Sequence, residues 1–144
     1  MAELTLQHVA KTRDAIENYN FNPDMPLEAV VKQIVRNHIA LHKIEPELHH
    51  ILTEQIARIG GLDHQEQMFE DIRKKLLWML QFHTETKTIK HPEIVIMMSF
   101  STVEAVTHNT MLRQPELLDS ELFEAELIRL ILGFIINAER DENV

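Results

Sequence analysis

The positions of proline and glycine most strongly constrain how this chain folds. There are only five prolines and three glycines among 144 residues: Pro23, Pro26, Pro46, Gly60, Gly61, Pro92, Pro115 and Gly133. Proline is tolerated in the first turn of a helix, and glycine is common just past its end. The segments between these residues repeat their apolar side chains at spacings of three and four, as helices do. The sequence therefore predicts an all-α bundle of about six helices, with no convincing strand.

The expected helices follow from these boundaries. They cover residues 2 to about 18, from Pro26 through Leu41, from Pro46 to Gly60, from Asp63 to about Leu80, from Pro92 to about Arg113, and from Ser120 as a plausible N-cap to about Ala138. Residues 85–90 and 114–119 read as polar links between the last three helices. We expect a single domain over residues 1–144, because the length suits one hydrophobic core.

The last two expected helices carry more apolar surface than one contact face requires. The fifth is apolar nearly all round at its start, and the stripe of the sixth is too wide for a single neighbour. Such a surplus favours a dimer in which both helices pack against the same helices of a second chain. The same pattern would also fit the centre of a monomeric bundle. Gly133 lies within the last helix, where close approach of a neighbouring helix would explain it.

Charge and composition exclude several classes of protein. The net charge of −9 argues against this chain binding a phosphate backbone by itself. The sequence has no cysteine, which excludes disulfides, thiolate metal sites and Cys nucleophiles. It also has no secretory signal pattern and no apolar run near the length of a membrane span. We expect a cytoplasmic protein that does not contact a membrane.

Nine histidines are a high number for this length, and His38 and His42 are the most suggestive pair. A spacing of four places both imidazoles on one helix face, where they could share a metal ion. The sequence has a single E-x-x-H motif, Glu47 to His50, whereas a di-iron bundle needs two. We therefore expect no metal and no cofactor, with His38 semi-buried beside a cavity or bonded to a carbonyl and His42 on the surface.

Glu104 and His108 are also four residues apart and could form an acid–base pair. No nucleophile accompanies them, and there is no glycine-rich phosphate loop. A hydrogen bond within the helix or a contact across a dimer explains the pair better than catalysis. We expect a protein that is not an enzyme.

Three segments in the second half resemble a known family. They are Val103 to His108 (V-E-A-V-T-H), Met111 to Leu118 (M-L-R-Q-P-E-L-L) and Leu127 to Phe134 (L-I-R-L-I-L-G-F). Together with Pro23 to Leu27 and Pro46 to His49, they resemble the C-terminal domain of TetR/AcrR-type transcriptional regulators. None of these motifs is catalytic, but their order and spacing cover most of the chain.

The resemblance implies a domain that binds a small hydrophobic effector and forms a homodimer. In this family the last two helices pack against their twins as a four-helix bundle, and effector binding releases the protein from operator DNA. The helix-turn-helix domain that reads DNA is expected to be absent here, so operator DNA would be contacted only through that missing N-terminal part of a parent protein. The effector, the operator and the regulated genes are not identified by the sequence.

Mapping the family pattern onto this chain identifies two sets of candidate residues. The expected pocket residues are His38, Leu41, Ile56, Phe69, Ile72, Leu76, Trp78, Met79, Phe82, Met97 and Phe100. The expected dimer face comprises Val103, Val106, Thr107, Met111, Phe123, Leu127, Leu130, Ile131 and Phe134. Methionine and aromatic side chains at helical spacing are more often ordinary core than pocket.

Two alternatives remain open. In the first, the chain dimerises with a full-length relative and sequesters it, and its own core is filled and binds no ligand. Less favoured is a metal-binding bundle that uses His38, His42, Glu47 and His50. A cavity larger than a water molecule would favour the effector interpretation over the first alternative.

Overall fold

The computed structural model describes residues 10–11, 13–43 and 62–142. Residues 10–11 and 13–17 are helical. The named elements are α2 (Leu27–His42), α4 (Leu62–Phe82), α5 (Pro92–Arg113), the short 3₁₀ helix η1 (Pro115–Asp119) and α6 (Glu121–Ile136). Apart from an isolated bridge between Ile89 and Arg140, no strand pairing occurs in these ranges. The prediction of an all-α fold is confirmed.

The local signals of the sequence set the helix boundaries. Pro92 is the first residue of α5, and Pro26 is the N-cap of α2. Ser120 caps α6 as expected, because its Oγ accepts a hydrogen bond from the backbone N–H of Phe123 at 3.2 Å. The helix expected between residues 46 and 60 lies outside the described residues.

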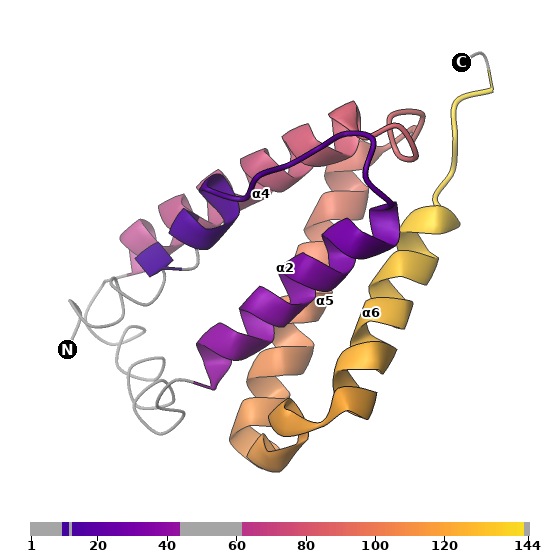
Figure 1. Ribbon diagram of the computed structural model, residues 1–144. Coiled ribbons are helices and arrows are strands. Elements are labelled where there is room, and N and C mark those ends of the chain that lie inside the picture. The colour runs from indigo at the N-terminus through magenta and orange to yellow at the C-terminus, as the bar shows by residue number, and fades with distance from the viewer. Residues whose placement is uncertain (1–9, 12, 44–61, 143–144) are drawn as a thin grey trace.

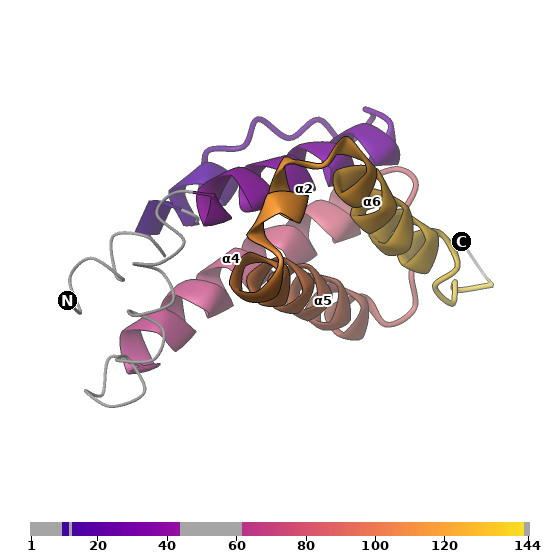
Figure 2. The same cartoon turned by 90° about the horizontal axis from the view of Figure 1, so that it is seen from below.

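The helices form two layers. Figures 1 and 2 show α2 and α6 side by side in one layer and α4 and α5 in the other. The contacts agree, since α2 packs on α6 and α5, and α5 packs on α4 and α6. The core between the layers is made of aliphatic side chains from all four helices, with Val35 of α2 and Ile72 of α4 among the most deeply buried.

The turn between α4 and α5 joins the ends of several elements. The imidazole Nε2 of His83 lies 2.6 Å from the carbonyl oxygen of Met25, just before α2. Thr86 Oγ1 donates a hydrogen bond to the carbonyl of Leu80 at 2.6 Å, and Arg140 donates to the carbonyl of Glu85 at 2.9 Å. These bonds hold the start of α2 and the segment after α6 against the C-terminal end of α4.

None of the described helices is both long and apolar enough to cross a membrane.

Candidate functional site: a cavity and a histidine–glutamate cluster

An apolar cavity of about 100 Å³ lies between the two helix layers. Residues of α2, α4, α5 and α6 line it, together with residues of the helical segment 13–17 and of the turn after α4. The lining residues are Ala15, Ile16, Leu27, Val30, Val31, Ile34, Val35, Asn37, His38, Leu41, Ile72, Leu76, Met79, Leu80, His83, Thr86, Ile96, Ser99, Phe100, Val103, Ile131 and Ile135. For scale, an engineered apolar cavity of about 150 Å³ in another protein stays dry and binds benzene.

The cavity brings together about half of the residues expected to form a pocket. His38, Leu41, Ile72, Leu76, Met79 and Phe100 all line it. Phe69 is not part of the lining but packs against Phe100, with ring centroids 5.7 Å apart. Ile56 lies outside the described residues.

Three other expected pocket residues lie away from the cavity. Trp78, Phe82 and Met97 are exposed and do not line it. Successive helix residues are rotated by about 100°, so the position before a buried residue faces another direction. Met79 therefore points inward while Trp78 points outward, where it contacts Phe21 and Phe82.

The pocket expectation included His38 and Leu41 but missed the first half of α2. Leu27, Val30, Val31, Ile34 and Val35 all line the cavity. The sequence carried the signal, since these residues form the apolar stripe of that helix. The stripe identifies an inward face but does not distinguish a filled core from a cavity wall.

The cavity wall contains a buried hydroxyl group. Ser99 lies on α5 among the lining residues, and its Oγ is buried without a hydrogen-bond partner among the described residues. Burial of an unsatisfied hydroxyl is costly. A molecule in the cavity that carries one polar group would therefore find a donor or acceptor at this position.

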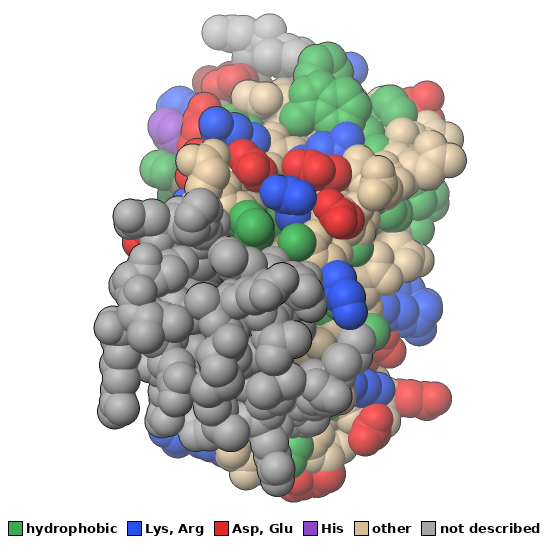
Figure 3. Space-filling model, turned by 90° about the vertical axis from the view of Figure 1, so that its left-hand side faces the viewer, with side chains coloured by type: hydrophobic (Ala, Val, Ile, Leu, Met, Phe, Trp, Pro, Cys, Tyr) green, Lys and Arg blue, Asp and Glu red, His purple; other side chains and the backbone are tan. Residues whose placement is uncertain are grey.

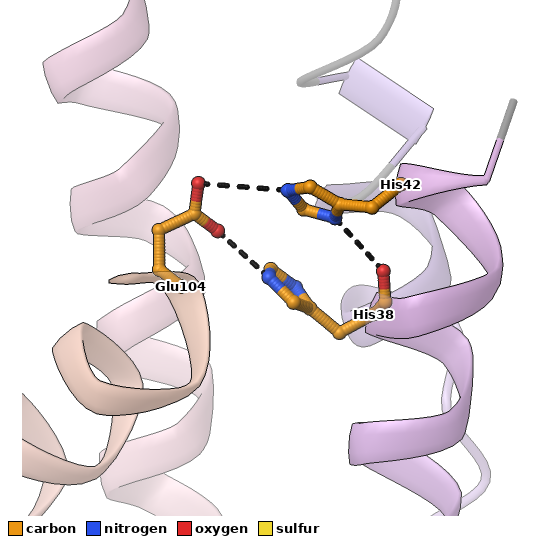
Figure 4. Close-up of side chains that lie close together, drawn as sticks. All are labelled: His38, His42 and Glu104. Carbon is orange, nitrogen blue, oxygen red and sulfur yellow. Dashed lines mark hydrogen bonds and ion pairs between the residues drawn. The ribbon is translucent and has the colours of Figure 1, made fainter. Parts of the chain in front are cut away.

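His38, His42 and Glu104 form a cluster where α2 faces α5 (Figure 4). The Nε2 atom of His38 lies 2.8 Å from Oε2 of Glu104, and the Nε2 atom of His42 lies 3.8 Å from Oε1. Both imidazoles are buried, at 6% and 2% exposed. The carboxylate thus spans two imidazoles that are one helical turn apart.

The cluster stabilises the ionised form of Glu104. Burial by itself would raise the pKa of this carboxyl group. The close Nε2 contact of His38 and the nearby imidazole of His42 act in the opposite direction and prevail, so the pKa of Glu104 lies below its ordinary value. The site therefore presents a carboxylate anion to the two rings at neutral pH.

The structure corrects one prediction about this cluster and shows another contact that the sequence did not indicate. His42 was expected on the surface, which is wrong, because it is 2% exposed between α2 and α5. Glu104 and His108 were expected to form a hydrogen bond within their helix or a contact across a dimer, and the structure directs the carboxylate of Glu104 toward α2. The ring centroid of His108 lies 6.4 Å from that of His42, beside the cluster.

The residues expected to form a dimer face are divided between the core and the surface. Five of them, Val103, Thr107, Met111, Leu127 and Ile131, are buried within one chain. Val106, Phe123 and Phe134 are half-buried against the same core, and Leu130 is 54% exposed. The apolar stripes of α5 and α6 are wide because each helix packs against α2 and also carries apolar side chains on its outer face.

The outer faces of α5 and α6 carry the apolar surface that the core does not use. Its exposed large side chains are Ile94, Met97, Met98 and Leu112 on α5, and Leu122, Leu130 and Ile136 on α6. We call these residues the outer apolar face. Gly133 has open space around it, because a Cβ added there would meet no atom within 4 Å. No neighbour within the described chain therefore requires a glycine at this position.

The surface charge is mixed on the side of the molecule shown in Figure 3. Acidic and basic side chains lie next to one another there, around small apolar patches. Among the described ion pairs is that of Arg73 with Glu70 on α4, at 2.7 Å and half-exposed. The described part of this face has no concentrated positive charge of the kind that binds a phosphate backbone.

The two-layer helical fold, the apolar cavity and the outer apolar face define an all-helical domain with room for a small ligand. The family described as "Tetracyclin repressor-like, C-terminal domain" matches residues 26–134. Since this match covers more than half of the chain, the chain belongs to the TetR family of transcriptional regulators, as a ligand-binding and dimerisation domain. Comparison with curated proteins and with solved structures found no match.

Proposed function

We propose that this domain senses a small hydrophobic effector, forms a homodimer, and thereby controls the release of a TetR-like repressor from operator DNA. The cavity between the helix layers is the observation that carries this proposal. In this proposal the domain is not an enzyme, and operator DNA is contacted by another part of the regulator.

The size and lining of the cavity indicate the kind of effector. A volume of about 100 Å³ exceeds the space that one water molecule needs, and the walls are almost entirely aliphatic and aromatic. A filled interior is what the alternative of a ligand-free interaction protein would require. The cavity therefore favours the effector proposal over that alternative.

Ser99 favours an effector with one hydrogen-bonding group. Its unpaired Oγ is the polar group of the cavity wall that most needs a partner. A hydroxyl or carbonyl group on an otherwise apolar ligand would satisfy it without introducing a second unpaired group. Ligands of this class should bind more tightly than hydrocarbons of the same shape.

The position of the cavity suggests how binding reaches the rest of the regulator. Its walls come from both layers, so a ligand contacts α2 and α6 on one side and α4 and α5 on the other. A ligand that fits one spacing of these layers better than another shifts the equilibrium by its difference in affinity. The movement of α4 relative to α5 and α6 would then change the geometry of the dimer.

The test is binding of a matched ligand pair, naphthalene and 2-naphthol, measured by displacement of a fluorescent apolar probe. Wild-type protein should bind both, with 2-naphthol tighter. Ser99→Ala should remove the preference for the alcohol. Leu76→Trp, which places a large ring at the cavity wall, should weaken both ligands about tenfold or more.

The control is Lys32→Trp, because Lys32 is exposed on α2 and does not line the cavity. It should leave both affinities unchanged. Absence of probe binding by the wild type, or equal weakening by both tryptophan variants, would contradict an effector site in this cavity.

A further inference from the structure

The cluster of His38, His42 and Glu104 has the composition and the dimensions of a metal site. One ligand atom from each residue lies within 4.8 Å of the other two. Ligand atoms bonded to a tetrahedral zinc ion at about 2.0–2.1 Å lie roughly 3.3 Å apart. The observed separations of 2.8 Å and 3.8 Å from the carboxylate oxygens to the two Nε2 atoms lie on either side of that value.

The hydrogen bond made by Nδ1 of His42 leaves its Nε2 atom available to bind a metal. Its Nδ1 atom lies 2.9 Å from the carbonyl oxygen of His38. Because a carbonyl oxygen can only accept a hydrogen bond, this contact requires the proton on Nδ1. In the neutral ring, Nε2 then presents its lone pair toward Glu104, which is the arrangement usual for metal-binding histidines.

All three residues lie in regular helices. His38 and His42 lie one turn apart in α2, and Glu104 lies in the middle of α5. Both rings are buried, and the carboxylate is 28% exposed. A site of this kind needs little rearrangement to bind an ion, and it retains access to solvent through the carboxylate.

We propose that His38, His42 and Glu104 bind a divalent transition-metal ion of the zinc type between α2 and α5. Two imidazole nitrogens with one carboxylate suit zinc, iron or nickel rather than magnesium or calcium, which prefer oxygen ligands. Three protein ligands leave at least one coordination position for water or another ligand. Since His38 also lines the cavity, the ion lies next to the space assigned to the effector.

The sequence alone did not predict this combination of ligands. Glu104 and the two histidines are separated by more than sixty residues, and E-x-x-H spacing directed attention to Glu47 and His50 instead. The inference does not depend on an effector in the cavity, since the ligand atoms belong to the chain itself.

The experiment is titration of the metal-stripped protein, without an affinity tag, with Zn²⁺ by isothermal calorimetry. We expect one ion per chain with a micromolar or lower dissociation constant and a higher melting temperature in its presence. Co²⁺ should give visible d–d absorption of a nitrogen- and oxygen-ligated ion. Glu104→Gln, His38→Gln and His42→Gln should each weaken Zn²⁺ binding about 100-fold or more and remove the Co²⁺ bands.

The matched controls are His91→Gln and Glu93→Gln, which change an exposed histidine and an exposed carboxylate near the start of α5. Both should bind Zn²⁺ as the wild type does. Circular dichroism identifies any variant that fails to fold, and Glu104→Gln keeps the shape of the side chain if a histidine variant does not fold. Absence of Zn²⁺ binding by the wild type, or undiminished binding by folded Glu104→Gln, would overturn the proposal. Naphthalene binding measured on the same samples reports separately on the cavity.

Discussion

The carboxylate of Glu85 caps α2 from the turn that follows α4, with its Oε2 atom 2.7 Å from the backbone nitrogen of Leu27. The N-cap of α2 is Pro26, which offers no side-chain acceptor. A helix begins with backbone N–H groups that have no partner within the helix and with a partial positive charge. Glu85 satisfies one of these groups from a distant part of the chain and ties α4 to α2.

Replacement of this remote cap should destabilise the fold. Glu85→Ala is expected to lower the free energy of unfolding by about 1 kcal/mol, the usual value for the loss of a helix cap. Urea denaturation followed by circular dichroism measures it. Lys87→Ala, an exposed change in the same turn, should stay within about 0.5 kcal/mol of the wild type. An equal effect of the two variants would show that the Glu85 contact contributes nothing.

Truncation of a side chain at the cavity wall should both destabilise the protein and enlarge the ligand site. Ile72 is fully buried on α4 and lines the cavity. Ile72→Ala is expected to cost about 2–5 kcal/mol, because the lost contacts are not replaced. If the fold persists, a ligand larger than naphthalene should bind this variant more tightly than the wild type.

The control for this truncation is Lys74→Ala, since Lys74 is exposed on the same helix and does not line the cavity. It should change the free energy of unfolding by less than about 0.5 kcal/mol and leave ligand size preference unaltered. Both properties are measured by denaturation and by probe displacement. A small effect of Ile72→Ala on stability would argue against the packing described around the cavity.

The outer apolar face provides a prediction for the dimer. Wild-type protein should be a dimer by light scattering at micromolar concentration, because this face would otherwise expose large aliphatic side chains to water. Leu130→Asp should shift the protein to monomer, since a carboxylate buried in an interface has no partner. Lys32→Asp, an exposed change on α2, should leave the dimer intact. A monomeric wild type would rule out this assignment.

A substitution at Gly133 tests the dimer interface separately from the fold of one chain. Open space surrounds it, so Gly133→Leu should fit the single chain and add helix propensity of about 1 kcal/mol. In a dimer with close helix approach at this point, the same side chain would clash. We expect a well-folded monomer by circular dichroism and light scattering, whereas an unchanged dimer would place the interface elsewhere.

Several elements of the fold could be predicted because their signals are local. As expected, α5 begins at Pro92 and ends at Arg113, and Ser120 caps α6. The apolar stripe of α2 correctly identified the inward face of that helix. The pocket residues were only partly predicted, since Met79 lines the cavity and Trp78 beside it does not. A difference of one position in a helix changes the direction of a side chain by about 100°.

The sequence by itself determined that the chain is helical, because the bonds that form a helix join residues four positions apart and depend on nearby residues. It also determined where most of the described helices begin and end. Only the tertiary structure decided that Glu104 meets His38 and His42, that Glu85 caps α2, and that Thr107 belongs to the core of one chain. Those contacts depend on how separate helices cross, and helices with similar apolar stripes can cross in more than one way.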